Sequence, residues 1–249
     1  MNRNLCYTAL ILRSRPSGES NRELWLLSAE AGLLRATVFG GPKSKLRSYA
    51  SPFHSGLAFI YQDPSKDARK LSDFDVRSWR PGLRELYERT MAADALAETI
   101  LASHGGGGNW EAALSLAESA LDALEAADAE TCLRIVLWFL WQWADFLGLR
   151  PDFEHCSLCG KAIPADTSLM FSPREGGLVC DQCCSESKYK TGLMETSPGC
   201  RRWLETVRLL SPSQLIRYTL DKKSYREAKA LTTQILADTL GRRLLSWEW

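Results

Sequence analysis

The sequence predicts an α+β protein made of an N-terminal five-stranded barrel, a helical domain and an inserted four-cysteine module. Three observations predict this class. Short β-favouring segments fill the first 80 residues, segments with helical spacing follow them, and two Cys-x-x-Cys pairs lie in the second half. The 249 residues, 45% hydrophobic and 24% charged, are enough for one large domain or two to three small ones.

The expected strands are short, and Gly, Pro, Ser or Asp residues separate them. Within one of them, Leu33, Arg35, Thr37 and Phe39 alternate with their neighbours as the two faces of a strand do. Five short strands in about 75 residues suit a small closed barrel such as the OB-fold. An SH3-like barrel fits the pattern nearly as well. The strands are expected at Leu5–Arg13, Glu23–Ser28, Gly32–Phe39, Pro52–Tyr61 and Lys70–Val76.

Helical spacing begins after Pro81, a residue that suits a first helical turn. The longest uncharged apolar run, Ile135–Ala144, has about half the length that a membrane span needs, so it predicts a buried helix. Gly105–Gly108 predicts a flexible loop, because no Lys-Ser/Thr pair follows it to make a phosphate loop. Helices are expected over 83–103, 110–126, 129–147, 198–209 and 224–245.

Charge divides the chain in the same way as the predicted elements. Residues 1–80 hold 13 Lys or Arg against 7 Asp or Glu, residues 81–154 hold 4 against 13, and residues 155–249 hold 14 against 10. Such asymmetry indicates separate surfaces with separate partners. We expect an OB-fold domain at 1–80, helical domain parts at 81–154 and 196–249, and a zinc module at 155–195.

The cysteines favour a metal site. Five of the eight fall between Cys156 and Cys184, and no signal-peptide pattern precedes the first strand, which also predicts an intracellular chain. Two Cys-x-x-Cys pairs separated by twenty residues can hold one Zn²⁺ tetrahedrally, with a small hairpin between them. The predicted ligands are Cys156, Cys159, Cys180 and Cys183.

The predicted zinc is structural, because four thiolates leave no open position for a reactant. Cys184 is an alternative to Cys183 as the fourth ligand, and His155 is expected to be a bystander. Four reduced cysteines without metal are the other reading. The remaining cysteines are expected to be small buried side chains: Cys6, Cys132 and Cys200.

A glycine-rich basic loop, Gly40–Ser48, joins two predicted strands and carries three positive charges and no negative ones. Such a loop at a barrel rim can reach phosphates, although a solvated loop without a ligand is as good a reading. Arginines of the neighbouring strands could extend the patch. The candidate DNA-binding residues are Arg13, Arg15, Arg35, Lys43, Lys45 and Arg47.

A second basic cluster lies near the C-terminus, at Lys222, Lys223, Arg226 and Lys229, where a solvated helix face is the favoured reading. Nothing in the sequence indicates catalysis. The three histidines are far apart, and we find no nucleophile elbow, phosphate loop or dinucleotide fingerprint. We therefore do not expect an enzyme.

The order of several motifs resembles that of the bacterial recombination mediator family RecO over nearly the whole chain. No single motif is specific, but their sequence and spacing together are. The matching segments are Leu12–Ser20, Gly32–Ala36, Gly40–Ser48, Pro81–Leu83, Leu147–Asp152, Cys156–Gly160, Phe171–Pro173, Glu175–Gly177 and Cys180–Cys183.

The resemblance implies an OB-fold, a helical domain and an inserted zinc module, acting in DNA repair by the RecF pathway. It implies binding to single- and double-stranded DNA, annealing of complementary strands, and help in loading RecA. It also implies binding to RecR and to the acidic C-terminal tail of single-strand-binding protein, in the cytoplasm at the nucleoid, without nucleotide hydrolysis. A protein–protein adaptor with incidental DNA contact is the rival hypothesis. In the family this basic loop is usually richer in arginine, whereas here Pro42 and Leu46 stand among its charged residues.

Overall fold

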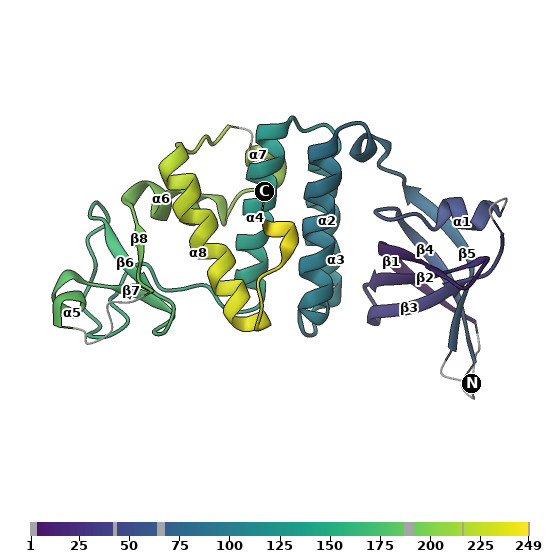
Figure 1. The fold of residues 1–249 in the computed structure, drawn as a ribbon, viewed down its shortest axis with the longest axis horizontal. Coiled ribbons are helices and arrows are strands. Elements are labelled where there is room, and N and C mark those ends of the chain that lie inside the picture. The colour runs from purple at the N-terminus through teal and green to yellow at the C-terminus, as the bar shows by residue number, and fades with distance from the viewer. Residues whose placement is uncertain (1–3, 42–43, 64–67, 187–191, 216, 249) are drawn as a thin grey trace. The chain divides into compact units, whose positions relative to one another are not determined.

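The computed structural model describes residues 4–41, 44–63, 68–186, 192–215 and 217–248 (Figure 1). The chain forms two compact units, Met1–Cys132 and Leu133–Trp249. Within these described ranges, the first contains the barrel, three α-helices and the start of a fourth, and the second contains the rest of that helix, the cysteine module and the C-terminal helices. Among the described residues, no helix combines the length and the hydropathy needed to cross a membrane.

Five strands of the first unit close into a barrel in the order β1-β2-β3-β5-β4, and β4 pairs with β1 to complete it. All pairs are antiparallel except β3 with β5, which meet in parallel at Thr37 and Lys70. This closed five-stranded barrel confirms the OB-fold expectation and excludes the SH3-like alternative, which orders its strands differently. The strands are β1 (Asn4–Ser17), β2 (Asn21–Ser28), β3 (Gly32–Val38), β4 (Ser55–Asp63) and β5 (Ala68–Ser78).

The barrel interior is filled by alternating residues of every strand, as the period of two requires. The largest include Ile11, Leu24, Ile60 and Phe74, each at most 1% exposed. Gly56 marks a close approach of β4 to β5, because a Cβ there would lie 2.0 Å from the carbonyl oxygen of Asp75. The barrel therefore has a solid core and uses its outer face for contacts.

A short helix, α1 (Lys45–Tyr49), occupies part of the predicted basic loop between β3 and β4. The expectation of a loop throughout Gly40–Ser48 was wrong at this point. Leu46 and Tyr49 pack against the barrel core, which gives the segment an apolar side and a reason to coil. Lys45 remains exposed on the other side of this helix.

Two longer helices complete the first unit, α2 (Tyr87–Ala102) and α3 (Trp110–Leu124). The predicted helix over 83–103 is interrupted, because Pro81–Arg84 forms a separate 3-10 turn, η1, and Leu86 is extended. A second 3-10 turn, η2 (His104–Gly106), opens the glycine segment before α3. Both helices pack against the barrel: a Cβ at Gly32 would lie 2.6 Å from the Trp110 ring.

The helices of the second unit are held by buried tryptophans. The indole Nε1 of Trp138 donates to the carbonyls of Val207 (3.1 Å) and Leu210 (3.0 Å), and that of Trp141 donates to Leu204 (2.9 Å). These donors satisfy carbonyls at a helix end that have no partner within the helix. The helical elements here are α4 (Ala129–Phe146), α6 (Pro198–Val207), α7 (Pro212–Leu215), α8 (Lys222–Leu240) and η3 (Leu245–Trp247).

Helix α8 ends five residues earlier than the sequence predicted. Gly241 follows it in the left-handed conformation at φ 66°, which terminates a helix and turns the chain. Beyond that turn Leu244 and Trp247 are buried, so the last residues fold back as a packed segment. Arg242 and Arg243 therefore lie after the helix and not in its last turn.

The cysteine module is a small three-stranded sheet in the order β7-β6-β8. One short helix lies between β7 and β8 along the chain. Arg201 of α6 anchors the loop before the sheet, because its Nη2 donates to the carbonyls of Pro164 (3.0 Å), Ala165 (3.2 Å) and Thr167. The elements are β6 (Leu169–Ser172), β7 (Gly177–Val179), α5 (Asp181–Glu186) and β8 (Met194–Thr196).

Candidate metal centre and nucleic-acid interface

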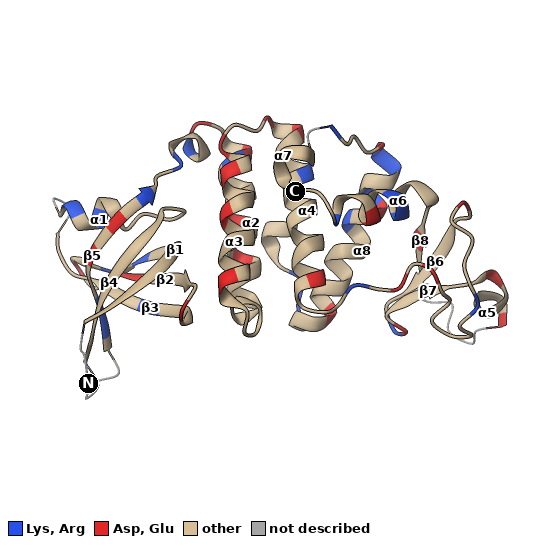
Figure 2. Cartoon of the chain, turned by 180° about the vertical axis from the view of Figure 1, so that it is seen from behind, with Lys and Arg blue, Asp and Glu red and all other residues tan. Residues whose placement is uncertain are grey.

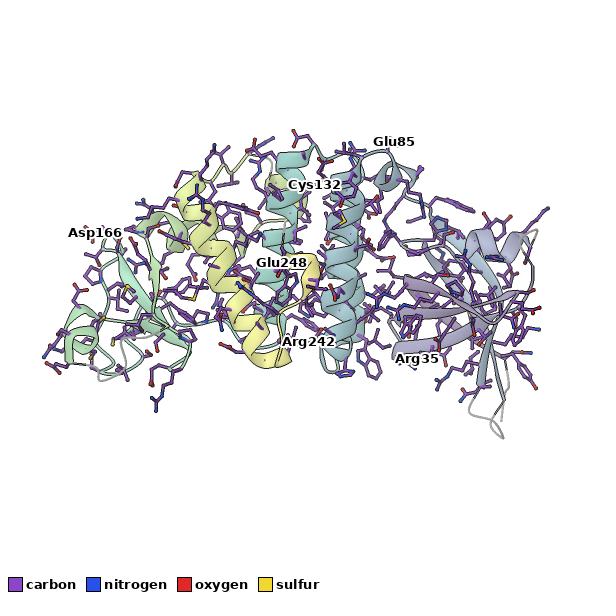
Figure 3. All side chains as sticks on the ribbon, viewed as in Figure 1. Arg35, Glu85, Cys132, Asp166, Arg242 and Glu248 are labelled. Carbon is purple, nitrogen blue, oxygen red and sulfur yellow. The ribbon has the colours of Figure 1, made fainter. Side chains whose placement is uncertain are left out.

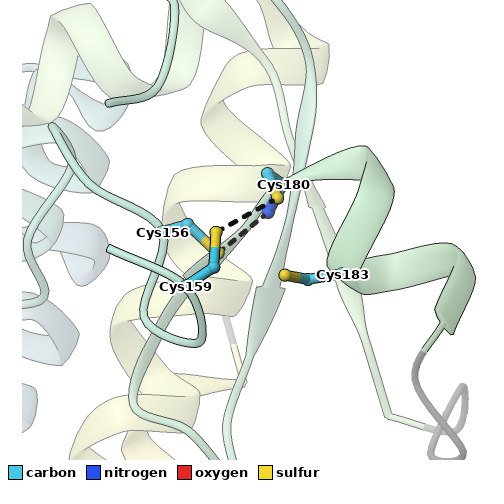
Figure 4. A group of neighbouring side chains, drawn as sticks. All are labelled: Cys156, Cys159, Cys180 and Cys183. Atoms are coloured by element: carbon cyan, nitrogen blue, oxygen red, sulfur yellow. Dashed lines mark hydrogen bonds between the residues drawn. The ribbon is translucent and has the colours of Figure 1, made fainter. Parts of the chain in front are cut away.

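Four cysteine side chains converge in the module (Figure 4). Cys156 and Cys159 lie in a tight turn, whose Gly160 takes a positive φ of 70°. Cys180 follows β7, and Cys183 lies in the first turn of α5. The hairpin of β6 and β7 returns the chain after the first pair, as the twenty-residue spacing predicted.

The distances between the four sulfur atoms suit one metal ion. All four lie within 4.8 Å of one another, and Cys159 Sγ is 3.8 Å from Cys180 Sγ. A tetrahedron with metal–sulfur bonds of about 2.3 Å has edges of about 3.8 Å. A disulfide would need about 2.05 Å. The four side chains could therefore hold a metal ion, and they are not bonded in pairs.

The surroundings of Cys156 also favour the ionised, thiolate form of its side chain. Burial opposes ionisation of Cys156, but N–H groups of Cys180, Cys159 and Leu158 directed at its sulfur lower its pKa to about 6. The first of these is the Cys180 N–H, 3.4 Å from Cys156 Sγ. The pKa of Cys183 is raised to about 12, because hydrogen bonds with the sulfur atoms of Cys180 and Cys159 stabilise its protonated form. A cation at the centre would reverse this effect.

Cys184 and His155 do not join the cluster. The sulfur of Cys183, and not that of Cys184, belongs to the group of four. Cys184 lines a shallow pocket on the module with Leu158 and Pro173. His155 Nδ1 lies 2.9 Å from Asp152 Oδ2, and the ring is exposed. The assignment of Cys183 as the fourth ligand stays a prediction that this geometry favours.

A second group of side chains lies on the outer face of β1, β2 and β3. The indole ring of Trp25 in β2 has the guanidinium carbon of Arg15 at 5.6 Å and that of Arg35 at 5.5 Å from its centroid. The flanking strands place them there, since Trp25 stands opposite Arg35 in the β2–β3 pair, and Arg15 lies on the same face of β1, two residues beyond the position opposite Trp25. Arg35 is labelled on β3 in Figure 3.

A similar pair lies further along the same face. Phe39, just beyond β3, is 50% exposed, and the Nζ of Lys70 in β5 is 5.4 Å from its ring centroid. Sequence reasoning did not identify Trp25, Phe39 or Lys70. The available signal was the alternation that put Phe39 on the same strand face as Arg35.

The six predicted DNA-binding residues are not equivalent in the structure. Arg15 and Arg35 meet over Trp25, and Lys45 and Arg47 lie together on α1. Arg13 is half-buried near Asp94 of α2. Burial raises the pKa of Asp94, and the charge of Arg13 partly offsets this. Lys43 lies outside the described residues. The DNA-binding role of all six stays a prediction.

The C-terminal basic cluster is partly engaged within the protein. Lys223 Nζ lies 2.8 Å from Glu195 Oε1 and 3.6 Å from Glu227 Oε1. Burial and then the charge of Arg243 lower the pKa of Lys229. Ion pairs within the second unit therefore engage Lys223, one of the four cations of this cluster.

The charged residues are distributed unevenly within the first unit (Figure 2). Acidic residues follow one another along α2 and α3, whereas α1 is basic and the barrel strands carry basic residues together with some acidic ones. The barrel thus presents cations beside the half-buried ring of Trp25 and the exposed ring of Phe39. Proteins that bind single-stranded nucleic acid combine the same two kinds of side chain.

Comparison with known proteins gives the family. The model of the recombination protein O N-terminal domain matches residues 1–78, and that of the recombination protein O C-terminal domain matches residues 84–248. The chain belongs to the RecO family. Together the two matches cover nearly the whole chain. They meet between residues 78 and 84, where the barrel ends and the first helices begin.

Similar RecO proteins, each named DNA repair protein RecO, span almost the full chain. That of Pelotomaculum thermopropionicum is 32% identical over 96% of this chain and 90% of its own length. That of Myxococcus xanthus is 30% identical over 96% and 93%. That of Desulfitobacterium hafniense strain DCB-2 is 29% identical over 96% and 86%.

Proposed function

We propose that this chain is a recombination mediator of the RecF pathway. It binds single- and double-stranded DNA, anneals complementary strands and helps to load RecA on coated single strands. Membership in a family of DNA repair proteins supports the general role. The observation that carries the DNA-binding role is the outer barrel face, where Arg15 and Arg35 flank an aromatic ring.

Contacts to the phosphate backbone would make binding sensitive to salt and tolerant of sequence. The cations of α1 and the outer strands can follow a backbone, while the acidic helices α2 and α3 would repel it. DNA should therefore lie along the barrel face and away from those helices. Cytoplasmic location at the nucleoid, binding to RecR and binding to the acidic tail of single-strand-binding protein are part of the same proposal.

The metal at the four cysteines is proposed to be one Zn²⁺ with a structural role. Four thiolates at tetrahedral spacing are the donor set that Zn²⁺ takes in closed sites. The small sheet of β6, β7 and β8 has few residues with which to build a core, so metal binding stabilises its fold. Such a site has no open coordination position for a reactant.

An annealing assay tests the proposal. The full chain is mixed with two complementary oligonucleotides, either bare or coated with single-strand-binding protein, and duplex formation is followed over time. We expect faster annealing in both cases, and slower annealing when Arg15 and Arg35 are changed to alanine. A chain that binds neither single strands nor duplex would refute the proposal.

A protein–protein adaptor is the second candidate. The acidic helices α2 and α3 favour it, since they offer a surface that DNA would avoid. A chain that fails to anneal DNA and yet binds RecR or the single-strand-binding protein tail would support this reading in place of the first.

A further inference from the structure

The ring of Trp25 lies between two cations on the outside of the barrel. Arg15 approaches from β1 and Arg35 from β3, the strands on either side of β2. Both arginines are exposed, whereas Trp25 is only half-buried. An indole attracts a guanidinium without neutralising its charge. Both cations therefore remain available to an anion from solution.

Phe39 repeats the arrangement on the same face. Arg35 and Phe39 are four residues apart on one side of the chain, which corresponds to about 13 Å along a strand. Lys70 lies over the Phe39 ring as the arginines lie over Trp25. Two aromatic rings, each beside a cation, thus stand in a row along β2, β3 and β5.

A single strand of nucleic acid offers groups that suit both kinds of side chain in this row, nucleobases for the rings and phosphates for the cations. An unpaired base can stack on an aromatic ring, and each such contact is typically worth a factor of about 5 to 150 in affinity. A guanidinium that leaves the ring can pair with a phosphate of the same strand. A duplex offers the phosphates only, because the faces of its bases are covered by their neighbours.

We propose that Trp25, together with Phe39, is a stacking site for unpaired nucleobases that gives the barrel its preference for single strands. A base takes the place of one guanidinium on the Trp25 ring, and Arg15 and Arg35 then contact phosphates. Glu23, opposite Arg15 in the β1–β2 pair, limits the positive charge at this edge, so stacking and not charge alone distinguishes the strands. This inference rests on the proposed DNA-binding function.

The test compares three probes by fluorescence anisotropy at several salt concentrations: a single-stranded oligonucleotide, its duplex, and an abasic strand that has phosphates but no bases. We expect Trp25→Ala to weaken binding of the single strand by about 5- to 150-fold. Duplex and abasic strand should bind as before, and the salt dependence should not change because no charge is removed.

Two variants serve as controls. Trp25→Phe keeps an aromatic ring and should restore most of the single-strand affinity, which also separates stacking from misfolding. Phe59→Ala removes a ring that is 39% exposed on β4, and it should leave all three affinities unchanged. Thermal unfolding of each variant shows that the barrel is intact.

Equal single-strand affinity in wild type and Trp25→Ala would overturn the inference while leaving the proposed function in place. So would a wild-type chain that binds the abasic strand as tightly as the normal one. A wild-type chain that binds none of the three probes would refute the proposed function itself.

Discussion

Arg80 donates from Nε to Oδ1 of Asp122 at 2.5 Å, joining the segment after the barrel to helix α3. Its Nη1 donates to the carbonyl of Phe53 (2.8 Å) and to Ser55 Oγ (3.1 Å) at the start of β4. Glu118 Oε1 lies 4.0 Å from Nη2. The side chain is almost fully buried, so one guanidinium connects the barrel to the helices of the first unit.

Changing Arg80 to alanine should lower the free energy of unfolding of the first unit by about 1–3 kcal/mol. The carbonyl of Phe53 would lose a buried donor. Asp122, which is 60% exposed, would return to water at little cost. Thermal unfolding followed by circular dichroism measures the loss.

Arg80→Gly is the matched control for that change. Arg80 has a left-handed backbone at φ 44°, which costs a residue with a Cβ about 1–2 kcal/mol. Glycine removes the same hydrogen bonds but relieves this strain, so it should destabilise less than alanine does. An alanine variant as stable as wild type would show that Arg80 does not connect the two parts.

The sequence alone was sufficient for the features that depend on local patterns. Alternation along the strands predicted the barrel, and the spacing of the cysteines predicted the cluster of four. Helix α1 was missed, because a five-residue helix with Leu46 and Tyr49 as its apolar contacts has too few positions to show a helical period.

Lateral neighbours could not be predicted in the same way. Alternation tells which face Trp25 and Arg35 occupy, but the partner from β1 depends on the pairing register. A register shift between Ile11 and Arg13 alters that register, and such an irregularity leaves no clear sign in the sequence. The proximity of Arg13 to Asp94 likewise depends on how α2 packs on the barrel.

The cations of α1 give a prediction that separates charge from stacking. Changing Lys45 and Arg47 together to alanine should weaken single-strand and duplex binding alike. The slope of log affinity against log salt concentration should fall by about 1.4 for single strands, since each lost phosphate contact contributes about 0.7. Leu46 and Tyr49, which hold α1 on the barrel, are left unchanged. An unaltered slope would exclude α1 from the DNA contact.

The four-cysteine cluster predicts one tightly bound metal per chain. Cys156→Ser should lose it, as measured by plasma emission spectrometry of the purified protein, and the module should unfold at a lower temperature. Metal binding in such sites is worth on the order of 10 kcal/mol, so the effect should be large. Cys184→Ser is the control and should retain the metal. If Cys184→Ser loses the metal and Cys183→Ser keeps it, the fourth ligand is Cys184.

His54 should make the first unit less stable as the solution becomes acidic. Its Nδ1 lies 2.9 Å from the Tyr49 carbonyl, its Nε2 lies 3.4 Å from Arg84 Nη2, and its ring packs edge-on against Trp79. Burial lowers its pKa in the folded state, and the charges of Arg84 and Arg80 lower it further.

The unfolded chain therefore takes up a proton near pH 6.5 that the folded chain accepts only at lower pH, so stability falls as the pH drops through 6.5. His54→Gln cannot titrate in this range. The melting temperature of wild type minus that of His54→Gln should become smaller as the pH falls from 7.5 to 5.5. Because acid also protonates the Cys156 thiolate in both proteins, the difference between the two, and not either curve alone, reports on His54. A gap that stays constant over this range would mean that His54 accepts its proton as readily in the folded state as in the unfolded one.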